Sequence, residues 1–264
     1  MAKINLDKYY TPSDLAEYCV KKTKEVIGEE NVTEWLEPSA GAGVFLPYLD
    51  NNYLAFDIEP EAENIEQANY LELELPYFKG RCVIGNPPFG TNTLVKSFYN
   101  KSINICDYIA FILPISQFDN NYQLYKFDLI HSEKLHNVYY SKKQLDCCFN
   151  IYSRPKILNK KPCYKLKDVV LHEYRRGEKE LKNVYDIGIC SFGRGIIGNI
   201  PKYVGYYAKE IYFEIKTEKY KSEIIDLVKN TEWESKLCLS ISGQTNLSLW
   251  KVYKYLREQI PQLV

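Results

Sequence analysis

The sequence WLEPSAGAG at residues 35–43 decides the fold of this chain. Trp35 and Leu36 have strand character, and the small residues after them allow the backbone to turn sharply from a strand into a helix. The N-terminus of such a helix presents free N–H groups to a ligand. A tight turn that binds no ligand explains a lone glycine-rich segment equally well. The neighbouring segments therefore have to decide between a ligand-binding turn and a purely structural one.

The next strand, YLAFD at residues 53–57, ends in an acidic residue. A carboxylate at the end of a neighbouring parallel strand accepts hydrogen bonds from both ribose hydroxyls of a nucleoside. A phosphate-binding loop is excluded because no Gly-Lys-Ser/Thr follows the glycines, and the G-x-G-x-x-G turn of dinucleotide sites is absent. Asp57 and the glycine-rich turn therefore favour an adenosine cofactor that lacks a pyrophosphate.

A third segment, Asn86-Pro87-Pro88-Phe89, follows the strand RCVIG at residues 81–85. Two consecutive prolines make the backbone rigid and extended, which fixes the Asn86 amide and keeps the Pro87 carbonyl out of strand pairing. These two oxygens suit the two N–H groups of an exocyclic amine, and Phe89 suits stacking on its ring. A purely structural Pro-Pro turn competes with this interpretation, but it does not account for the two preceding segments.

The order of apolar runs predicts an α/β fold with a central, mostly parallel sheet over residues 1–162. Residues 13–27 have the spacing of an amphipathic helix, and residues 147–153 add another strand. From about residue 163 the pattern changes to alternating short strands and helices, including a strand at 236–243. We therefore expect a second, small α+β domain over residues 163–264.

Charge is distributed unevenly along the chain, although 34 Lys and Arg balance 34 Asp and Glu. Residues 1–75 carry 5 basic against 16 acidic side chains, a net charge of −11, whereas residues 139–182 carry 12 against 5, a net charge of +7. A concentrated basic segment is suited to a phosphate backbone, because neutralising phosphates releases counterions. A solvated, lysine-rich face is the competing explanation.

The remaining composition excludes several classes of protein. The 8 cysteines form no C-x-x-C pair, and the 3 histidines are too few and too widely spaced for a metal site, so we expect reduced thiols and no metal. No apolar stretch approaches the length of a membrane span, and the segment MAKINLDKYYTP does not resemble a signal peptide. We expect a cytoplasmic protein of bacterial or phage origin that does not associate with membranes.

In order and spacing, these segments resemble the S-adenosylmethionine-dependent amino-methyltransferases of DNA, in particular the N6-adenine enzymes of the gamma motif order. The resemblance covers about residues 8–155 and begins with Lys8-Tyr9-Tyr10-Thr11-Pro12. It implies a Rossmann-like methyltransferase domain at 1–162 and assigns the cofactor to Tyr10, Thr11, Glu37, Pro38, Ser39, Ala40, Gly41, Gly43, Asp57, Ile58, Asn69, Tyr70 and Asn86. Asn69 stands where the family usually has Asp, so an amide oxygen would contact the cofactor adenine.

The resemblance also implies the chemistry: direct transfer of a methyl group to N6 of a flipped-out adenine, without a metal, by Asn86, Pro87, Pro88 and Phe89. The second aromatic that stacks on the target base matches Phe149 best, with Tyr139, Tyr140 and Tyr152 competing for the role. Only 86 − 37 = 49 positions separate Glu37 from Asn86. Target recognition is therefore expected in residues 163–264.

The molecule that carries the adenine is less closely defined than the acceptor nitrogen. RNA adenine methyltransferases and protein glutamine methyltransferases also use an Asn-Pro-Pro-aromatic turn, because an amide nitrogen poses the same geometric problem. The N-terminal Tyr-Thr-Pro segment and the long C-terminal region favour double-stranded, sequence-specific DNA. No nuclease cluster is evident, so a cognate restriction endonuclease, if the protein has one, would be encoded separately. The modification half of a restriction pair, a solitary methylase and a phage enzyme all fit the sequence. A non-catalytic, methyltransferase-like module would require a broken catalytic turn, and residues 86–89 are intact.

Overall fold

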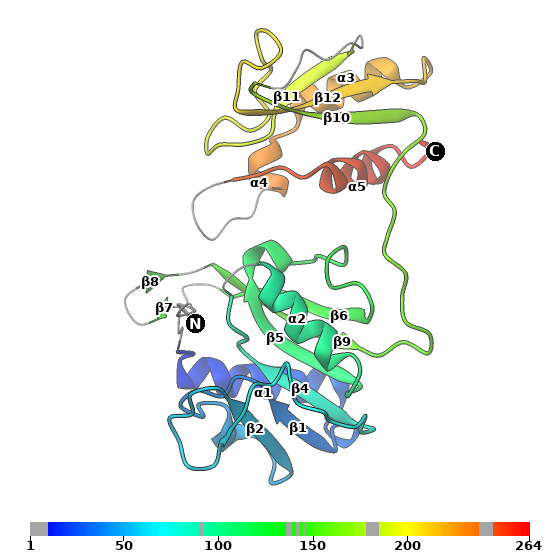
Figure 1. Ribbon diagram of the computed structural model, residues 1–264. Helices are drawn as coiled ribbons and strands as arrows, with labels where there is room; N and C mark the ends of the chain where they lie inside the picture. The colour runs from blue at the N-terminus through cyan, green and yellow to red at the C-terminus, as the bar shows by residue number, and fades with distance from the viewer. Residues whose placement is uncertain are drawn as a thin grey trace. The chain divides into compact units, whose positions relative to one another are not determined.

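The computed structural model describes residues 10–89, 92–135, 139–140, 143–144, 146–177, 185–237 and 245–264. The chain forms two compact units, Met1–Pro162 and Cys163–Val264 (Figure 1). The helices of the first unit are α1 (Ser13–Ile27) and α2 (Asn92–Ser102), with short 3-10 turns η1 (Glu29–Asn31), η2 (Leu46–Tyr48) and η3 (Ile115–Gln117). The predicted helix over residues 13–27 is confirmed, and it ends at Gly28, whose φ of 89° suits a glycine.

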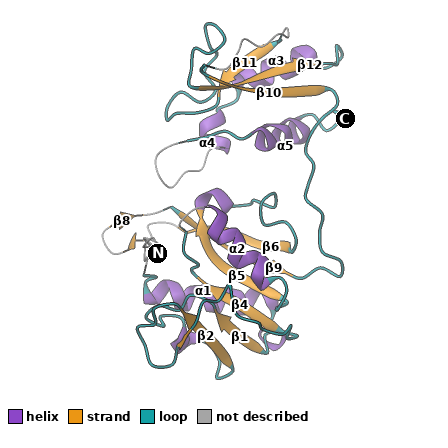
Figure 2. Ribbon diagram, viewed as in Figure 1, coloured by secondary structure: helices purple, strands orange, loops and turns teal. Residues whose placement is uncertain are grey.

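A seven-stranded sheet forms the centre of the first unit, with the order β3-β2-β1-β4-β5-β9-β6 (Figure 2). The pairs from β3 through β5 are parallel, whereas β9 runs antiparallel to both β5 and β6. This is the mostly parallel, Rossmann-like sheet that the sequence predicts. Its strands are β1 (Glu34–Glu37), β2 (Tyr53–Asp57), β3 (Glu66–Gln67), β4 (Arg81–Gly85), β5 (Tyr108–Pro114), β6 (Asp128–Leu135) and β9 (Cys147–Ser153), and β7 (Tyr139–Tyr140) pairs separately with β8 (Lys143–Gln144).

Helices α1 and α2 cover opposite faces of this sheet. The Tyr18 hydroxyl of α1 donates a hydrogen bond of 2.8 Å to Glu133, which lies directly opposite Phe149 in the pairing of β6 with β9. On α2, the Tyr99 ring lies edge-on to Tyr152, with 5.3 Å between centroids. Positions 149 and 152 of one strand point to opposite faces. Burying both faces explains why β4 and β5 are almost uniformly apolar.

The connection from β1 to β2 differs from the prediction. The sequence predicted a helix directly after the glycine-rich turn, but the structure has only the 3-10 turn η2 there. Pro47 lies in this turn, and the polar residues Asp50-Asn51-Asn52 follow shortly afterwards. Fewer than ten residues separate Gly43 from Tyr53. That length is too short for a regular crossover helix together with its loops.

The second unit has its own antiparallel sheet and its own core. Its strands, in the order β10-β12-β11, are β10 (Val169–Arg175), β12 (Lys209–Ile215) and β11 (Ile187–Cys190), and its helices are α3 (Lys221–Asn230), α4 (Trp233–Leu237) and α5 (Leu249–Gln259). Phe213, Trp233 and Leu256 are among the buried residues at its centre. The α+β character predicted for this region is confirmed. Most of the strand predicted at 236–243 lies outside the described residues.

Among the described residues, no helix has both the length and the apolar character needed to cross a lipid bilayer.

Candidate active site

The three sequence motifs lie at the carboxyl ends of adjacent parallel strands. Glu37 ends β1, Asp57 ends β2, and Asn86 directly follows β4. β1 pairs with both β2 and β4, so the three positions are neighbours along one edge of the sheet. The chain winds outward in opposite directions from β1 and β4, which makes this edge the topological switch point where open α/β sheets bind ligands.

The glycine-rich turn after β1 is tied to the end of β2 through the Asp57 carboxylate. One carboxylate oxygen accepts a hydrogen bond of 2.8 Å from the Gly41 N–H, and the other accepts one of 2.8 Å from the Glu59 N–H. Gly41 has φ of 53°, in the left-handed region that favours glycine. A Cβ added at Gly41 would meet no atom within 4 Å, so open space lies beside this turn.

Glu37 is the most unusual residue at this edge, because its carboxyl group is almost completely buried. Its exposed fraction is 1%, and its Oε2 atom has no hydrogen-bond partner among the described residues. Burial, and then the negative charge of Asp57, raise the pKa of Glu37 well above its ordinary value. A buried acceptor without a donor is costly, so this position suits a ligand that brings a positively charged N–H donor.

The Asn86 turn is held from two sides. The Ser39 hydroxyl donates a hydrogen bond of 3.4 Å to the Asn86 carbonyl, which joins the turns after β1 and β4. The Asn86 Nδ2 donates one of 3.2 Å to the hydroxyl of the buried Thr11. Because Thr11 fixes the donor end of the side-chain amide, the acceptor end also has a defined direction. Pro87 and Phe89 are buried behind this turn, and Pro88 is half-buried.

The N-terminal segment therefore comes to the same edge as the other motifs. Besides the contact of Thr11, the Tyr10 hydroxyl donates a hydrogen bond of 2.7 Å to Glu61, in the loop after β2. The Glu61 N–H in turn donates to the Gly41 carbonyl at 2.9 Å. Glu61 was not singled out from the sequence. Lys8 and Tyr9 of the same motif lie outside the described residues.

The residues predicted around the cofactor adenine lie in different environments. Ile58 is 43% exposed beside Asp57, and the exposed Asn69 donates from Nδ2 to Glu72 at 2.7 Å. Tyr70 is instead a core residue, with its hydroxyl 2.8 Å from Ser102 of α2 and its ring 5.5 Å from Phe98. Its predicted contact with an adenine does not agree with this position.

Phe149, predicted to stack on the target base, also lies in the core. It is completely buried on β9, between β5 and β6, and on the sheet face that α1 covers. No ring face is left for a base, because the strand places the side chain under a helix. Tyr152 is likewise completely buried. The side chains of Tyr139 and Tyr140 lie outside the described part of the chain.

The turn after β5 adds a residue that the sequence argument missed. Gly85 pairs with Phe111, so β5 continues beyond the end of β4 and carries η3 to the same edge. Gln117 in η3 is 4% exposed, and its Oε1 lacks a hydrogen-bond partner among the described residues. The only available signal was its position after the apolar run that ends at Pro114.

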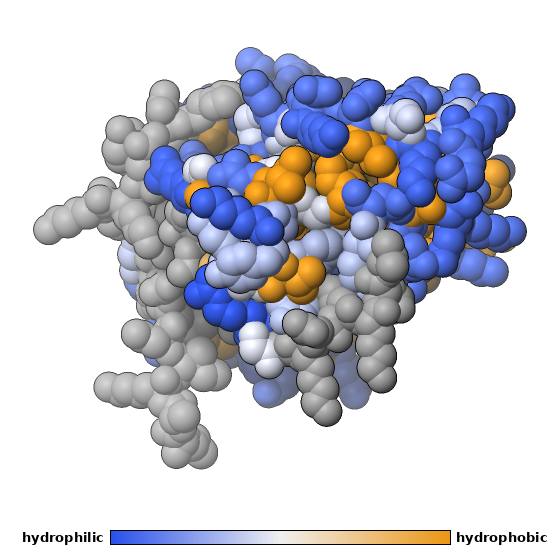
Figure 3. Space-filling view, turned by 90° about the horizontal axis from the view of Figure 1, so that it is seen from above, coloured by the Kyte–Doolittle hydropathy of each residue, from blue (hydrophilic) through white to orange (hydrophobic). Residues whose placement is uncertain are grey.

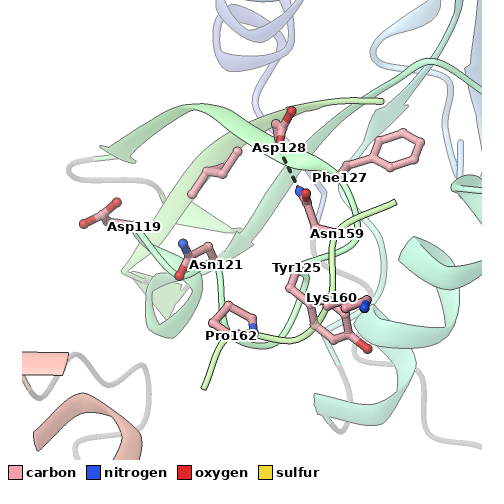
Figure 4. Close-up of a pocket in the computed structure, with 9 residues that line it drawn as sticks. Asp119, Asn121, Tyr125, Phe127, Asp128, Asn159, Lys160 and Pro162 are labelled. Carbon is pink, nitrogen blue, oxygen red and sulfur yellow. Dashed lines mark hydrogen bonds between the residues drawn. The ribbon is translucent and has the colours of Figure 1, made fainter. Parts of the chain in front are cut away.

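A separate pocket of about 380 Å³ lies elsewhere in the first unit (Figure 4). None of the predicted site residues lines it. Asp128 of the pocket accepts a hydrogen bond from Asn159 and is the first residue of β6. It pairs with Ser153 of β9, and Ser153 pairs with Tyr108, the first residue of β5. This side of the pocket is thus at the opposite end of the sheet from the three motifs. Within the described ranges, no group of three His, Cys, Asp or Glu side chains is placed to hold a metal ion.

No protein-family model matches the chain, and no curated protein matches it in sequence. Among solved structures it is similar to a candidate RNA methyltransferase from Pyrococcus horikoshii, with 19% identity and a TM-score of 0.46 over 58% of this chain and 90% of that one. The 23S rRNA methyltransferase ErmE has 12% identity and a TM-score of 0.42 over 60% and 74%.

A third similar structure is a candidate class I S-adenosylmethionine-dependent methyltransferase from Listeria monocytogenes, with 11% identity and a TM-score of 0.45 over 87% of this chain and 73% of that one. Because these identities and TM-scores are low, the fold is defined by the strand order and directions of the sheet itself. The chemistry has to be inferred from the residues at its carboxyl edge.

Proposed function

We propose that this protein is an enzyme that transfers a methyl group from S-adenosylmethionine to the N6 amino group of adenine in double-stranded DNA. The observation that carries the proposal is the position of Asn86. Its amide is held by Thr11, and its backbone carbonyl is joined by Ser39 to the turn that contains Glu37. The acceptor site thus adjoins the place where the cofactor fits.

The residues at the edge suit S-adenosylmethionine. Glu37 offers a buried carboxyl oxygen, without a partner among the described residues, to the ammonium group of the methionine moiety. Asp57 is placed for the ribose hydroxyls, and Ile58 is exposed beside it for the adenine. The open space at Gly41 leaves room for a ligand against the turn. When bound, this cofactor supplies an electrophilic methyl group on a sulfonium.

The Asn86-Pro87-Pro88-Phe89 turn would orient the amine that accepts the methyl group. Its two N–H groups would donate to the Asn86 side-chain oxygen and the Pro87 carbonyl, which directs the nitrogen lone pair toward the methyl donor. Catalysis of this kind consists mainly of positioning and electrostatics. Adenine must leave the duplex to reach the turn, and stacking on Phe89 would offset part of the unstacking cost.

The choice of DNA rests on the arrangement of the chain. The motifs that bind cofactor and amine occupy the first unit, and a second unit of about 100 residues follows them. The basic segment 139–182 spans the transition between the two units. A recognition unit after the catalytic motifs, together with a basic segment beside it, suits a sequence-specific DNA enzyme.

Transfer of tritiated methyl groups to unmethylated DNA, total RNA and a protein extract, assayed side by side, tests the proposal. We expect label in DNA, recovered as N6-methyladenine after digestion to nucleosides. Label confined to RNA or protein would refute DNA as the substrate, and label in another nucleoside of DNA would refute the acceptor.

The Asn86→Ala variant tests the catalytic assignment. We expect turnover to fall by about 100-fold or more, since transition-state positioning is lost, while S-adenosylmethionine still binds, through Glu37 and Asp57. Asn104→Ala, which changes an exposed asparagine on the first unit, is the matched control. Normal turnover of Asn86→Ala would exclude this residue from catalysis.

A further inference from the structure

Two segments of the second unit that are distant in sequence, residues 191–195 and 245–247, come together in the structure. Phe192 forms a β-bridge with Asn246. The Gly193 N–H donates to the Thr245 carbonyl at 3.1 Å, and the Leu247 N–H donates to the Ser191 carbonyl at 2.8 Å. Segments about 50 positions apart thus form one end of the second unit.

A third segment, residues 200–208, is joined to the same end, and we call it the aromatic loop. It has the sequence IPKYVGYYA and runs directly into β12, where the Ser191 N–H donates to the Lys209 carbonyl at 3.0 Å. Lys209 also donates from Nζ to the Asn246 side chain at 3.0 Å. The three segments therefore share one framework of hydrogen bonds.

The aromatic loop exposes large apolar and aromatic side chains. Ile200 is 52% exposed, Tyr203 is 65% exposed, and Val204 is 39% exposed. In the space-filling view, hydrophobic residues gather in a patch among hydrophilic ones (Figure 3). Tyr206 connects the rings of the loop, because it lies edge-on to both Tyr203 and Tyr207, with centroid separations of 5.3 and 4.8 Å.

Both cations and acids lie at this end of the unit: the Gly195 N–H donates to Glu234 at 2.7 Å, and Lys209 pairs with Glu173 at 2.8 Å. Residues 191–209 contain Arg194, Lys202 and Lys209 but no Asp or Glu. Arg194 and Lys202 are exposed, and the Lys202 ammonium lies 5.9 Å from the Tyr206 ring centroid. Exposed aromatic rings next to two exposed cations form a surface that complements a polyanion and offers rings to its sugars or to an unstacked base.

The aromatic loop is also held in a fixed shape. The completely buried Glu210 accepts hydrogen bonds from the N–H groups of Gly205 and Tyr207, at 2.8 and 2.6 Å, and from the Tyr212 hydroxyl at 2.6 Å. From the solvent side, Arg176 donates to the carbonyls of Gly205 and Tyr206. A buried carboxyl group that holds the backbone of the loop in place lowers the entropy lost when its exposed rings bind a partner.

We propose that the aromatic loop, together with Arg194, is a DNA-contacting surface of the second unit. Tyr203 offers its ring to a base or a sugar, and Lys202 and Arg194 offer their charges to phosphates. The inference rests on the proposed function in that its partner is DNA. Unlike the proposed function, it concerns binding and is measured without methyl transfer.

The experiment measures the affinity of the full-length protein for a fluorescein-labelled, random-sequence DNA duplex by fluorescence anisotropy. Tyr203→Ala should weaken binding by about 5-fold or more, the lower end of the effect of removing one stacking ring, because the bases of a duplex are stacked on one another. Tyr203→Phe should bind as the wild type does. Lys202→Ala should lower the slope of log affinity against log salt by about 1. Lys229→Ala, an exposed lysine of α3, is the matched control.

The outcomes separate the two proposals. Weaker binding by Tyr203→Ala and Lys202→Ala, with normal melting temperatures, supports the surface even if the wild type methylates RNA or protein rather than DNA. Unchanged affinity in these variants overturns the surface, even where the wild type methylates DNA normally. A wild-type protein that does not bind DNA at all overturns it as well.

Discussion

Two buried glutamates, one in each unit, differ in the hydrogen-bond partners that the fold gives to their carboxyl groups. Glu210 is completely buried at the start of β12 and accepts three hydrogen bonds. Glu37 is 1% exposed at the end of β1, and one of its oxygens has no partner among the described residues. The Glu210 carboxyl group holds its own loop, whereas the Glu37 carboxyl group has an oxygen to offer to the ligand that we propose.

The difference between the two glutamates indicates which of them suits ligand binding. A buried acceptor normally has its donors, because leaving it without them costs free energy of folding. Glu37 has an acceptor without a donor among the described residues, and it lies at the switch point of the sheet, next to the Gly41 turn and its open space. We therefore expect that replacing Glu210 lowers the stability of the protein, whereas replacing Glu37 raises it in the absence of ligand.

The largest effect on stability is expected at Glu210. Glu210→Ala removes the acceptor of three donors, which should lower the free energy of unfolding of the second unit by about 3 kcal/mol. Thermal unfolding followed by near-ultraviolet circular dichroism measures the change, with Glu223→Ala, an exposed acid of α3, as the control. A melting temperature that remains at the wild-type value would show that Glu210 is not needed to hold the loop.

At Glu37 the ligand-bound and ligand-free proteins should respond in opposite directions. Glu37→Gln should weaken S-adenosylmethionine binding by about 10- to 100-fold, the equivalent of one charge-assisted hydrogen bond, as measured by isothermal titration calorimetry. Without ligand, the variant should melt at a higher temperature, because it no longer buries a titratable carboxyl. Unchanged affinity would remove Glu37 from the cofactor site.

The stability gained by Glu37→Gln should depend on pH. Burial and the charge of Asp57 raise the pKa of Glu37 in the folded protein above the ordinary value of 4.5. The unfolded chain therefore loses its proton first as pH rises, and the wild type loses stability above about pH 4.5. The difference in melting temperature between variant and wild type should be present at neutral pH and disappear in acid. A difference that does not vary with pH would contradict this account.

The smallest effect is expected from Gly41→Ala. The left-handed φ should cost about 1 kcal/mol, and the new Cβ meets no protein atom within 4 Å. Gly188→Ala is the contrasting variant, because a Cβ there would overlap the ring of Tyr212, whose hydroxyl donates a hydrogen bond to Glu210. Chemical denaturation should show the larger loss for Gly188→Ala. The reverse order would mean that the space beside Gly41 is closed in solution.

Most of the architecture follows from local patterns. The helix over residues 13–27 and the strands at 53–57, 81–85 and 147–153 were predicted, because apolar spacing and turn residues are properties of short segments. The prediction of a helix after residue 43 was wrong, because the connection between β1 and β2 is too short to hold a regular helix. The contact of residues 191–193 with residues 245–247 was not predicted, because it depends on the path of the chain between them.

The sequence by itself determined the mostly parallel sheet and the order of the motifs, because both depend on neighbours along the chain. The chemistry of the Asn86 turn is likewise predicted from the sequence and stays a proposal. Only the tertiary structure decided that Thr11 holds Asn86 from 75 positions away and that the Glu37 Oε2 atom has no donor among the described residues. It also decided that Tyr70 and Phe149 belong to the core. Burial and hydrogen-bond partners depend on which face of the sheet a side chain occupies and on what packs there, and distant segments supply both.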